Sequence, residues 1–181
     1  MRVTATGSYL GTAPRVAVAA ADGEVTVHAE CGTECSLQLR VTVPAGLAAT
    51  VDSVSGEITA AGLGGPLDVT SRTGPIRVLG SAGPLTLRND SGEVTVTDSR
   101  SPSARITTGS GGVRAAFAAP PAGVEITTGD GGADLSVPGG AEYSIEARSA
   151  GGAPPQVTLP LGRDATRTLT VRTGNGGIVI H

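Results

Sequence analysis

A glycine followed two residues later by Ile, Leu or Val returns every nine residues between positions 56 and 94. Self-similarity at a fixed interval is the signature of one small structural unit stacked on copies of itself. The pairs are Gly56 with Ile58, Gly65 with Leu67, Gly74 with Ile76, Gly83 with Leu85 and Gly92 with Val94. This repeat constrains the architecture strongly and says little about activity.

A second, longer regularity covers the chain from residue 51 to its end. An apolar residue, a polar turn and another apolar residue seven positions on recur as Val51/Ile58, Val69/Ile76, Leu87/Val94, Ile106/Val113, Ile126/Ala133 and Val171/Ile178. Each turn places a small polar residue before a glycine, and these turn glycines are Gly56, Gly74, Gly92, Gly111, Gly131 and Gly176. Such a dipeptide suits a sharp corner, because the side chain can bond nearby backbone and glycine accepts positive φ.

Two architectures fit this pattern. In an antiparallel β-sandwich or meander each turn is a hairpin, whereas in a β-solenoid each turn is a corner and every strand pairs with its equivalent one coil later. The units that start at Val51 are spaced by 18, 18, 19 and 20 residues, and a weaker unit near Tyr143 precedes the last unit at Val171. Stacked coils need a near-constant length and hairpins do not, so the sequence favours a β-solenoid of roughly 18–20-residue coils.

Composition also indicates an all-β fold. The chain has 28 Gly and 12 Pro, too many for long helices, and its flanking segments alternate apolar and polar residues with period two. Only Phe117, Tyr9 and Tyr143 are aromatic, so the core must consist of layered Val, Ile, Leu and Ala. We predict one domain over residues 1–181, with 1–47 as entry or capping strands and 48–181 as stacked coils.

Stacking places equivalent residues in columns about 4.8 Å apart along the coil axis. One predicted column reads Val54, Arg72, Asp90, Gly109, Gly129, Gly174, and another reads Thr59, Arg77, Thr95, Arg114, Asp134. The first puts Arg72 beside Asp90 as an exposed ion pair of small energetic value. The second is mixed in charge and size and predicts a solvated face, with neither a threonine array nor an aromatic platform.

The N-terminal segment predicts two antiparallel strands around Val16 and Val25, joined by a tight turn at Asp22-Gly23, and a long strand from Ser36 to Val43. Between them lie Cys31 and Cys35. A local disulfide is the preferred interpretation and implies an oxidising compartment. Two free thiols are the alternative, and a metal site with His28 lacks a fourth ligand.

Other candidate chemistry is weak. The Ser110 loop superficially resembles the surroundings of a nucleophilic serine, but sister units carry Asp130 and Asn175 at that position, and His28 and His181 lie far away in sequence. Asp130 could belong to a calcium-binding nonapeptide, although earlier units lack the repeated aspartate such sites need. A net charge of −3, with scattered arginines, predicts no nucleic-acid binding. We expect no cofactor.

We also expect no membrane span, because no apolar stretch reaches 18 residues, and no signal peptide, because the run from Val16 to Ala21 is short and has no basic leader.

The repeats resemble the bacterial β-strand-repeat family called domain of unknown function 4097, which also carries the label of adhesin. The resemblance covers residues from about Val25 to the end. It lies in three segments: residues 40–47 (RVTVPAGL), residues 124–132 (VEITTGDGG) and residues 169–177 (LTVRTGNGG). It implies a solenoid-like fold, no established activity and, in actinobacterial members, a location outside a membrane anchor. The usual acidic residue after the turn glycine is present here as Glu57 and Glu93 and absent from the other corners.

We therefore expect a non-enzymatic, extracytoplasmic scaffold for adhesion or protein–protein interaction in the cell envelope, with a cytoplasmic location as the alternative. A bactofilin-like self-assembling protein is the rival, and a polysaccharide-cleaving β-helix using Arg72, Arg88 and Asp90 is the enzyme alternative. Residues 176–181 end on an apolar strand with no polar residue or helix to cover it. An open strand edge recruits partners, which predicts end-to-end self-association or capping by the N-terminal strands.

Overall fold

The computed structural model describes residues 1–21, 24–32, 34–160, 162 and 165–181, and every element in them is a β-strand. The chain divides into two compact units, Met1–Pro44 and Ala45–His181. The division falls close to the boundary predicted between entry strands and coils. That the two units form a single domain remains a prediction.

The first unit contains two two-stranded antiparallel ribbons. Strand β1 (Arg2–Tyr9) pairs with β4 (Cys35–Thr42), and β2 (Arg15–Ala21) pairs with β3 (Glu24–Glu30). The β2–β3 pairing and β4 confirm the strands expected there, while the turn at Asp22-Gly23 lies outside the described residues. Strand β1 was not expected, because Ala5 and Gly7 give its apolar face too weak a pattern.

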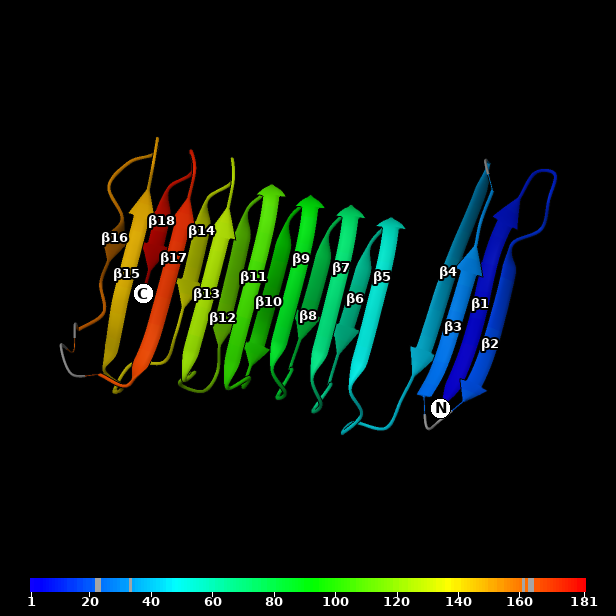
Figure 1. The fold of residues 1–181 in the computed structure, drawn as a ribbon, viewed down its shortest axis with the longest axis horizontal. Helices are drawn as coiled ribbons and strands as arrows, with labels where there is room; N and C mark the ends of the chain where they lie inside the picture. Colours follow the sequence, from blue (N-terminus) through cyan, green and yellow to red (C-terminus); the bar gives the residue numbers. More distant parts are fainter. Residues whose placement is uncertain (22–23, 33, 161, 163–164) are drawn as a thin grey trace. The chain divides into compact units, whose positions relative to one another are not determined.

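The second unit is a β-solenoid of about seven coils, built from two seven-stranded parallel sheets (Figure 1). The odd-numbered strands form one sheet: β5 (Ala49–Ser55), β7 (Leu67–Thr73), β9 (Leu85–Ser91), β11 (Ser103–Ser110), β13 (Gly123–Thr128), β15 (Tyr143–Ser149) and β17 (Arg167–Thr173). The even-numbered strands form the other: β6 (Ile58–Ala61), β8 (Ile76–Leu79), β10 (Val94–Ser99), β12 (Val113–Phe117), β14 (Ala133–Ser136), β16 (Gln156–Val157) and β18 (Ile178–Ile180). The sandwich alternative is wrong, because neighbouring strands within each sheet of this unit are parallel.

Equivalent apolar residues line up from coil to coil and fill the space between the sheets. Val69 pairs with Leu87, and Leu87 pairs with Ile106, as the 18- and 19-residue spacings predict. All three side chains are fully buried. Each buried aliphatic side chain contributes roughly 1.5–3 kcal/mol, so the repeated column is a main source of stability.

The order of the last two coils differs from the sequence. Strand β17 lies between β13 and β15, and β18 lies between β14 and β16, as the left side of Figure 1 shows. The last segment of the chain is therefore inserted inside the stack, and the coil before it in sequence forms the end. The expectation of an open C-terminal strand is wrong, because Ile178 and Ile180 are buried and β18 has a partner on both sides.

Strand β16 makes a poor template for further pairing at this end of the stack. It has only two residues, and Pro154, Pro155 and Pro160 surround it. Proline lacks the backbone N–H that a sheet ladder needs and is a common device for protecting edges.

Candidate functional site

The six predicted turn glycines all lie at the corner that joins an odd strand to the following even strand. At Gly56 the reason is conformational, since its φ is +106°. At Gly131 the reason is space, because a Cβ there would overlap the carbonyl oxygen of Gly111 in the preceding coil. The corner column is thus a close backbone stack and carries no side chain for chemistry.

Beneath these corners runs an inward-facing column of small polar residues that the sequence analysis missed. Successive strands contribute Ser53, Ser71, Asn89, Thr108, Thr128, Thr173 and Ser149. Several of them bond a carbonyl at the corner; Asn89 Nδ2 donates to Gly74 O at 2.9 Å and Thr173 Oγ1 donates to Gly176 O at 2.7 Å. The column therefore satisfies backbone groups where the sheet ladder stops.

The column is not fully satisfied. Asn89 Oδ1 and Thr108 Oγ1, on paired residues of β9 and β11, are buried without a hydrogen-bond partner among the described residues. The Tyr143 hydroxyl is buried in the same way, and its burial raises the pKa of the phenol. Unpaired buried polar atoms lower stability. These groups are therefore expected to destabilise the shaft, by which we mean the space between the two sheets together with the inward side chains that fill it.

The outer faces of both sheets carry ion pairs between arginines and carboxylates. In the odd-strand sheet Arg88 Nη1 lies 3.1 Å from Asp68 Oδ1, and Arg105 Nη2 lies 2.8 Å from Glu125 Oε2. In the even-strand sheet Arg77 pairs with Glu57 and Arg114 pairs with Glu93, each between adjacent coils. Hydrogen bonding to Arg77 holds the pKa of Glu57 below its usual value. The predicted column of Thr59, Arg77, Thr95, Arg114 and Asp134 is confirmed by the strand register.

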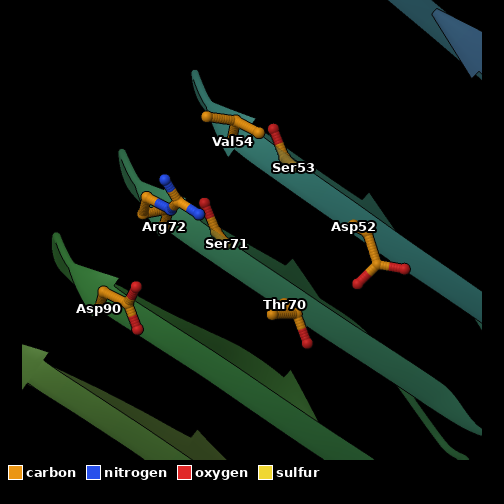
Figure 2. Close-up of a pocket in the computed structure, with 7 residues that line it drawn as sticks. All are labelled: Asp52, Ser53, Val54, Thr70, Ser71, Arg72 and Asp90. Atoms are coloured by element: carbon orange, nitrogen blue, oxygen red, sulfur yellow. The ribbon is translucent and has the colours of Figure 1, made fainter.

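A shallow hollow lies on the outer face of the odd-strand sheet near the glycine corner, with a volume of about 280 Å³. Figure 2 shows its lining: the outward residues Asp52, Val54, Thr70, Arg72 and Asp90, bordered by Ser53 and Ser71 of the inward column. The Arg72 guanidinium has no carboxylate within 4.0 Å among the described residues, so the expected ion pair with Asp90 is not formed. This leaves an exposed guanidinium near two aspartates.

In the described residues, the side chains of the other candidate sites have partners outside those sites. Arg88, proposed with Arg72 and Asp90 for glycan cleavage, is held by Asp68. Asp130 Oδ1 accepts a hydrogen bond from Asn175 Nδ2 at 2.6 Å. Within the described residues no group of three His, Cys, Asp or Glu side chains could hold a metal ion. His181 contacts Asp134, not the Ser110 loop.

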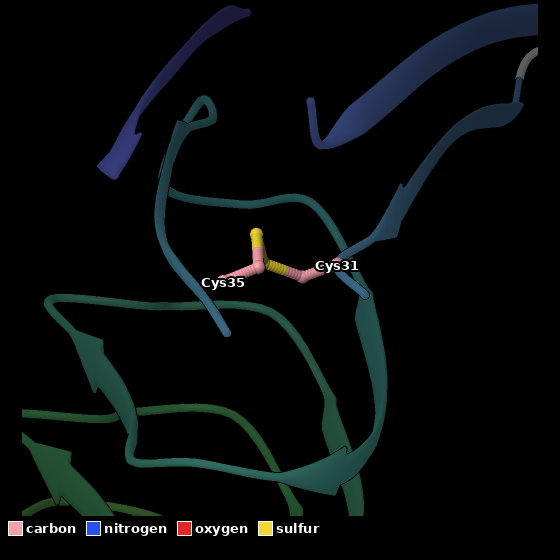
Figure 3. The surroundings of a disulfide bond; sticks show 2 residues. All are labelled: Cys31 and Cys35. Carbon is pink, nitrogen blue, oxygen red and sulfur yellow. A yellow bond between two sulfur atoms is a disulfide. The ribbon is translucent and has the colours of Figure 1, made fainter. Parts of the chain in front are cut away.

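Cys31 and Cys35 form a disulfide, with their Cα atoms 5.6 Å apart (Figure 3). This confirms the preferred interpretation and excludes both free thiols and a zinc site at this pair. His28 instead lies 3.2 Å from Glu30. A disulfide is typical of proteins that fold in an oxidising compartment.

Comparison with known proteins gives the same family as the repeat pattern. The sequence profile of the family described as Toastrack DUF4097 matches residues 11–168. The chain belongs to this family. The matched part of this Toastrack chain ends inside β17, at the start of the inserted coil. No curated protein and no solved structure matches the chain significantly. In the described part of the Toastrack chain, no helix is long and apolar enough to cross a bilayer.

Proposed function

We propose that this Toastrack chain is a non-enzymatic scaffold of the bacterial cell envelope that mediates adhesion or protein–protein interaction through its outer sheet faces. The observation that carries the proposal is the filled shaft. Aliphatic side chains occupy the space between the sheets, so the outer faces and the corners remain as the surfaces available to a ligand. Repeat proteins commonly bind partners through such extended, regular surfaces.

The hollow around Arg72 is the best candidate contact within that surface. An exposed guanidinium with no carboxylate partner within 4.0 Å in the described structure can form a bidentate bond with a carboxylate or phosphate group of a ligand. The neighbouring Asp52 and Asp90 would select against a purely anionic ligand and favour one that also carries donors, such as a polar peptide or a glycan.

Three measurements test the proposal: protease accessibility, cysteine alkylation and adhesion. In the organism that encodes the chain, we expect an externally added protease to degrade it in intact cells, and we expect Cys31 and Cys35 to resist alkylation until reductant is added. Beads coated with the purified chain should adhere to cell-envelope preparations. Arg72→Ala should weaken adhesion, whereas Arg77→Ala, which removes a guanidinium outside the hollow that is already paired with Glu57, serves as the matched control. A protease-resistant cytoplasmic chain with free thiols contradicts the envelope location, and adhesion unchanged by either substitution contradicts the assigned face.

Self-assembly is the second candidate, and the sheet ends favour it. Strand β5 pairs only with β7, and β15 pairs only with β17, in the described structure. A strand with one free edge can pair with another chain. Filaments visible by electron microscopy, or scattering mass that rises with concentration, would support this candidate. A strict monomer would oppose it.

The polysaccharide-cleaving alternative can be tested directly. It requires turnover on a panel of glycans that is lost in Asp90→Asn. We expect no turnover, because Arg88 is bound to Asp68 and is therefore not available to act together with Arg72 and Asp90.

A further inference from the structure

The insertion of β17 between β13 and β15 raises the question of why β15 does not occupy that place itself. The sequence would permit it. Residues paired in the inner strands of this sheet are spaced by 18, 19 and 20 residues from Leu67 to Leu85, Ala104 and Val124. Ile145, the β15 residue in the same column, follows Val124 by 21 residues and so continues the series.

The two strands also have the same pattern. Residues 144–149 read Ser-Ile-Glu-Ala-Arg-Ser and residues 168–173 read Thr-Leu-Thr-Val-Arg-Thr, and the sheet register pairs them in this order. At these six positions the two side chains agree: three pairs are polar and outward, two are apolar and inward, and Ser149 and Thr173 are both polar and inward. Only the first pair of the two strands, Tyr143 with Arg167, differs in kind. Strand β15 could therefore take the place of β17 beside β13 without turning its apolar face to solvent.

The connection between β14 and β15 allows both arrangements. Residues 137–142 now carry the chain past the inserted coil, which is a distance of two strand spacings, about 9.6 Å. Six residues can span roughly 20 Å. The same segment would cross a single spacing more easily.

Two features favour the observed order. Leu169 and Val171 are fully buried inside the stack, whereas their partners Ile145 and Ala147 at the end are only partly buried, so the larger Val171 takes the more buried place opposite Ala147. Tyr143, at the start of β15, is fully buried at the end of the stack. Direct pairing of β13 with β15 would also set Glu125 beside Glu146, which Thr170 now separates. Like charges opposite each other on neighbouring strands are unfavourable.

We propose that the C-terminal coil, residues 167–181, is a displaceable insert. The solenoid has a second arrangement in which β15 pairs with β13 and residues 167–181 leave the stack. Strands β17 and β18 then leave the core together, and their aliphatic inward faces become exposed. The balance between the two arrangements is set by the inward residues of β17 and by the charges of Glu125 and Glu146. This inference does not depend on the proposed function.

Engineered disulfides in the full chain distinguish the two arrangements. Thr127, Arg172 and Arg148 occupy one row across β13, β17 and β15. The pair Thr127→Cys with Arg172→Cys reports the observed order. The pair Thr127→Cys with Arg148→Cys reports the second, because two strand spacings exceed the roughly 7 Å that a disulfide can bridge between Cα atoms.

We expect the 127–172 pair to oxidise rapidly and the 127–148 pair to oxidise slowly within one chain. Val171→Ala, which weakens the insert, should speed 127–148 oxidation roughly tenfold or more. Glu125→Gln should speed it roughly two- to fivefold by removing the like charge. Leu87→Ala, in β9, controls for general destabilisation of the shaft.

The proposal is overturned if 127–148 oxidation requires denaturant, or if Leu87→Ala accelerates it as much as Val171→Ala does. Either result would mean that the pair forms only through global unfolding. An unchanged rate in Glu125→Gln would remove the electrostatic part of the explanation and overturn the stated balance.

Discussion

Thr108 and Thr128 occupy the same inward position on paired strands and differ in one respect. The Thr128 hydroxyl donates to the carbonyl of Gly131, whereas the Thr108 hydroxyl has no partner in the described structure. A buried hydrogen bond contributes about 1 kcal/mol, while a buried unpaired polar atom is unfavourable. The two residues thus form a natural comparison.

We predict that Thr128→Val lowers the free energy of unfolding by about 1 kcal/mol and that Thr108→Val leaves it unchanged or raises it. Urea denaturation followed by circular dichroism measures both. Equal destabilisation by the two substitutions would show that the hydroxyls are satisfied alike and that the polar column does not act as described.

The last corner holds two adjacent glycines, Gly176 and Gly177, in different surroundings. A Cβ on Gly176 would overlap the carbonyl of Gly131, while a Cβ on Gly177 would meet no atom within 4 Å. We predict that Gly176→Ala lowers the free energy of unfolding by about 2 kcal/mol or more, because backbone must shift, and that Gly177→Ala changes it by less than about 0.5 kcal/mol. Denaturant midpoints of the two variants check this; a larger loss in Gly177→Ala would contradict the corner geometry.

Single residues differ in how far their sequence context revealed their role. The turn glycines were predictable because a small polar residue followed by glycine is favoured at a sharp corner for local reasons: the side chain bonds nearby backbone, and glycine accepts positive φ. The inward polar column was not, since a serine or threonine two positions after a core residue looks like the end of a strand until the register is known. The missing Arg72–Asp90 pair is a matter of side-chain direction, which neighbouring positions in a column do not fix.

At the scale of elements, the disulfide closes only a short loop between β3 and β4. Closing so small a loop lowers the chain entropy of the unfolded state and thereby stabilises the folded state by roughly 2 kcal/mol. We predict that Cys31→Ser with Cys35→Ser speeds amide hydrogen exchange in the first unit, most in β4, and leaves exchange in β9 and β11 unchanged. Uniform loss of protection across both units would show instead that they unfold together.

The strands themselves were largely predictable, because strict alternation marks β7, β9 and β13 in the sequence. Their stacking order was not. Strands β15 and β17 share one polar pattern, and the choice between them depends on the size of the inward side chains and on a pair of glutamates two strands apart. These differences matter only through contacts between folded coils, which the repeat spacing does not contain. From the spacing alone, the coils would be expected to stack in the same order as they follow one another in the sequence.

The solenoid unit as a whole has one regular geometry. Equivalent residues return once per coil, the coils stack at about 4.8 Å, and the last coil in sequence is the second to last in the stack. The outward row that begins at Thr50 continues through Asp68, Thr86, Arg105, Glu125, Thr170 and Glu146. Because each coil contributes one residue to this row, distances between its members measure how many coils separate them along the stack.

The most direct test is pulsed electron paramagnetic resonance between a spin label at Thr50 and a second label at Glu125, Thr170 or Glu146. The strand spacing predicts separations of roughly 19, 24 and 29 Å between the backbone positions, in that order. A Glu146 label nearer to Thr50 than the Thr170 label would contradict the inserted coil. Distances that do not rise by one strand spacing per coil would contradict the solenoid.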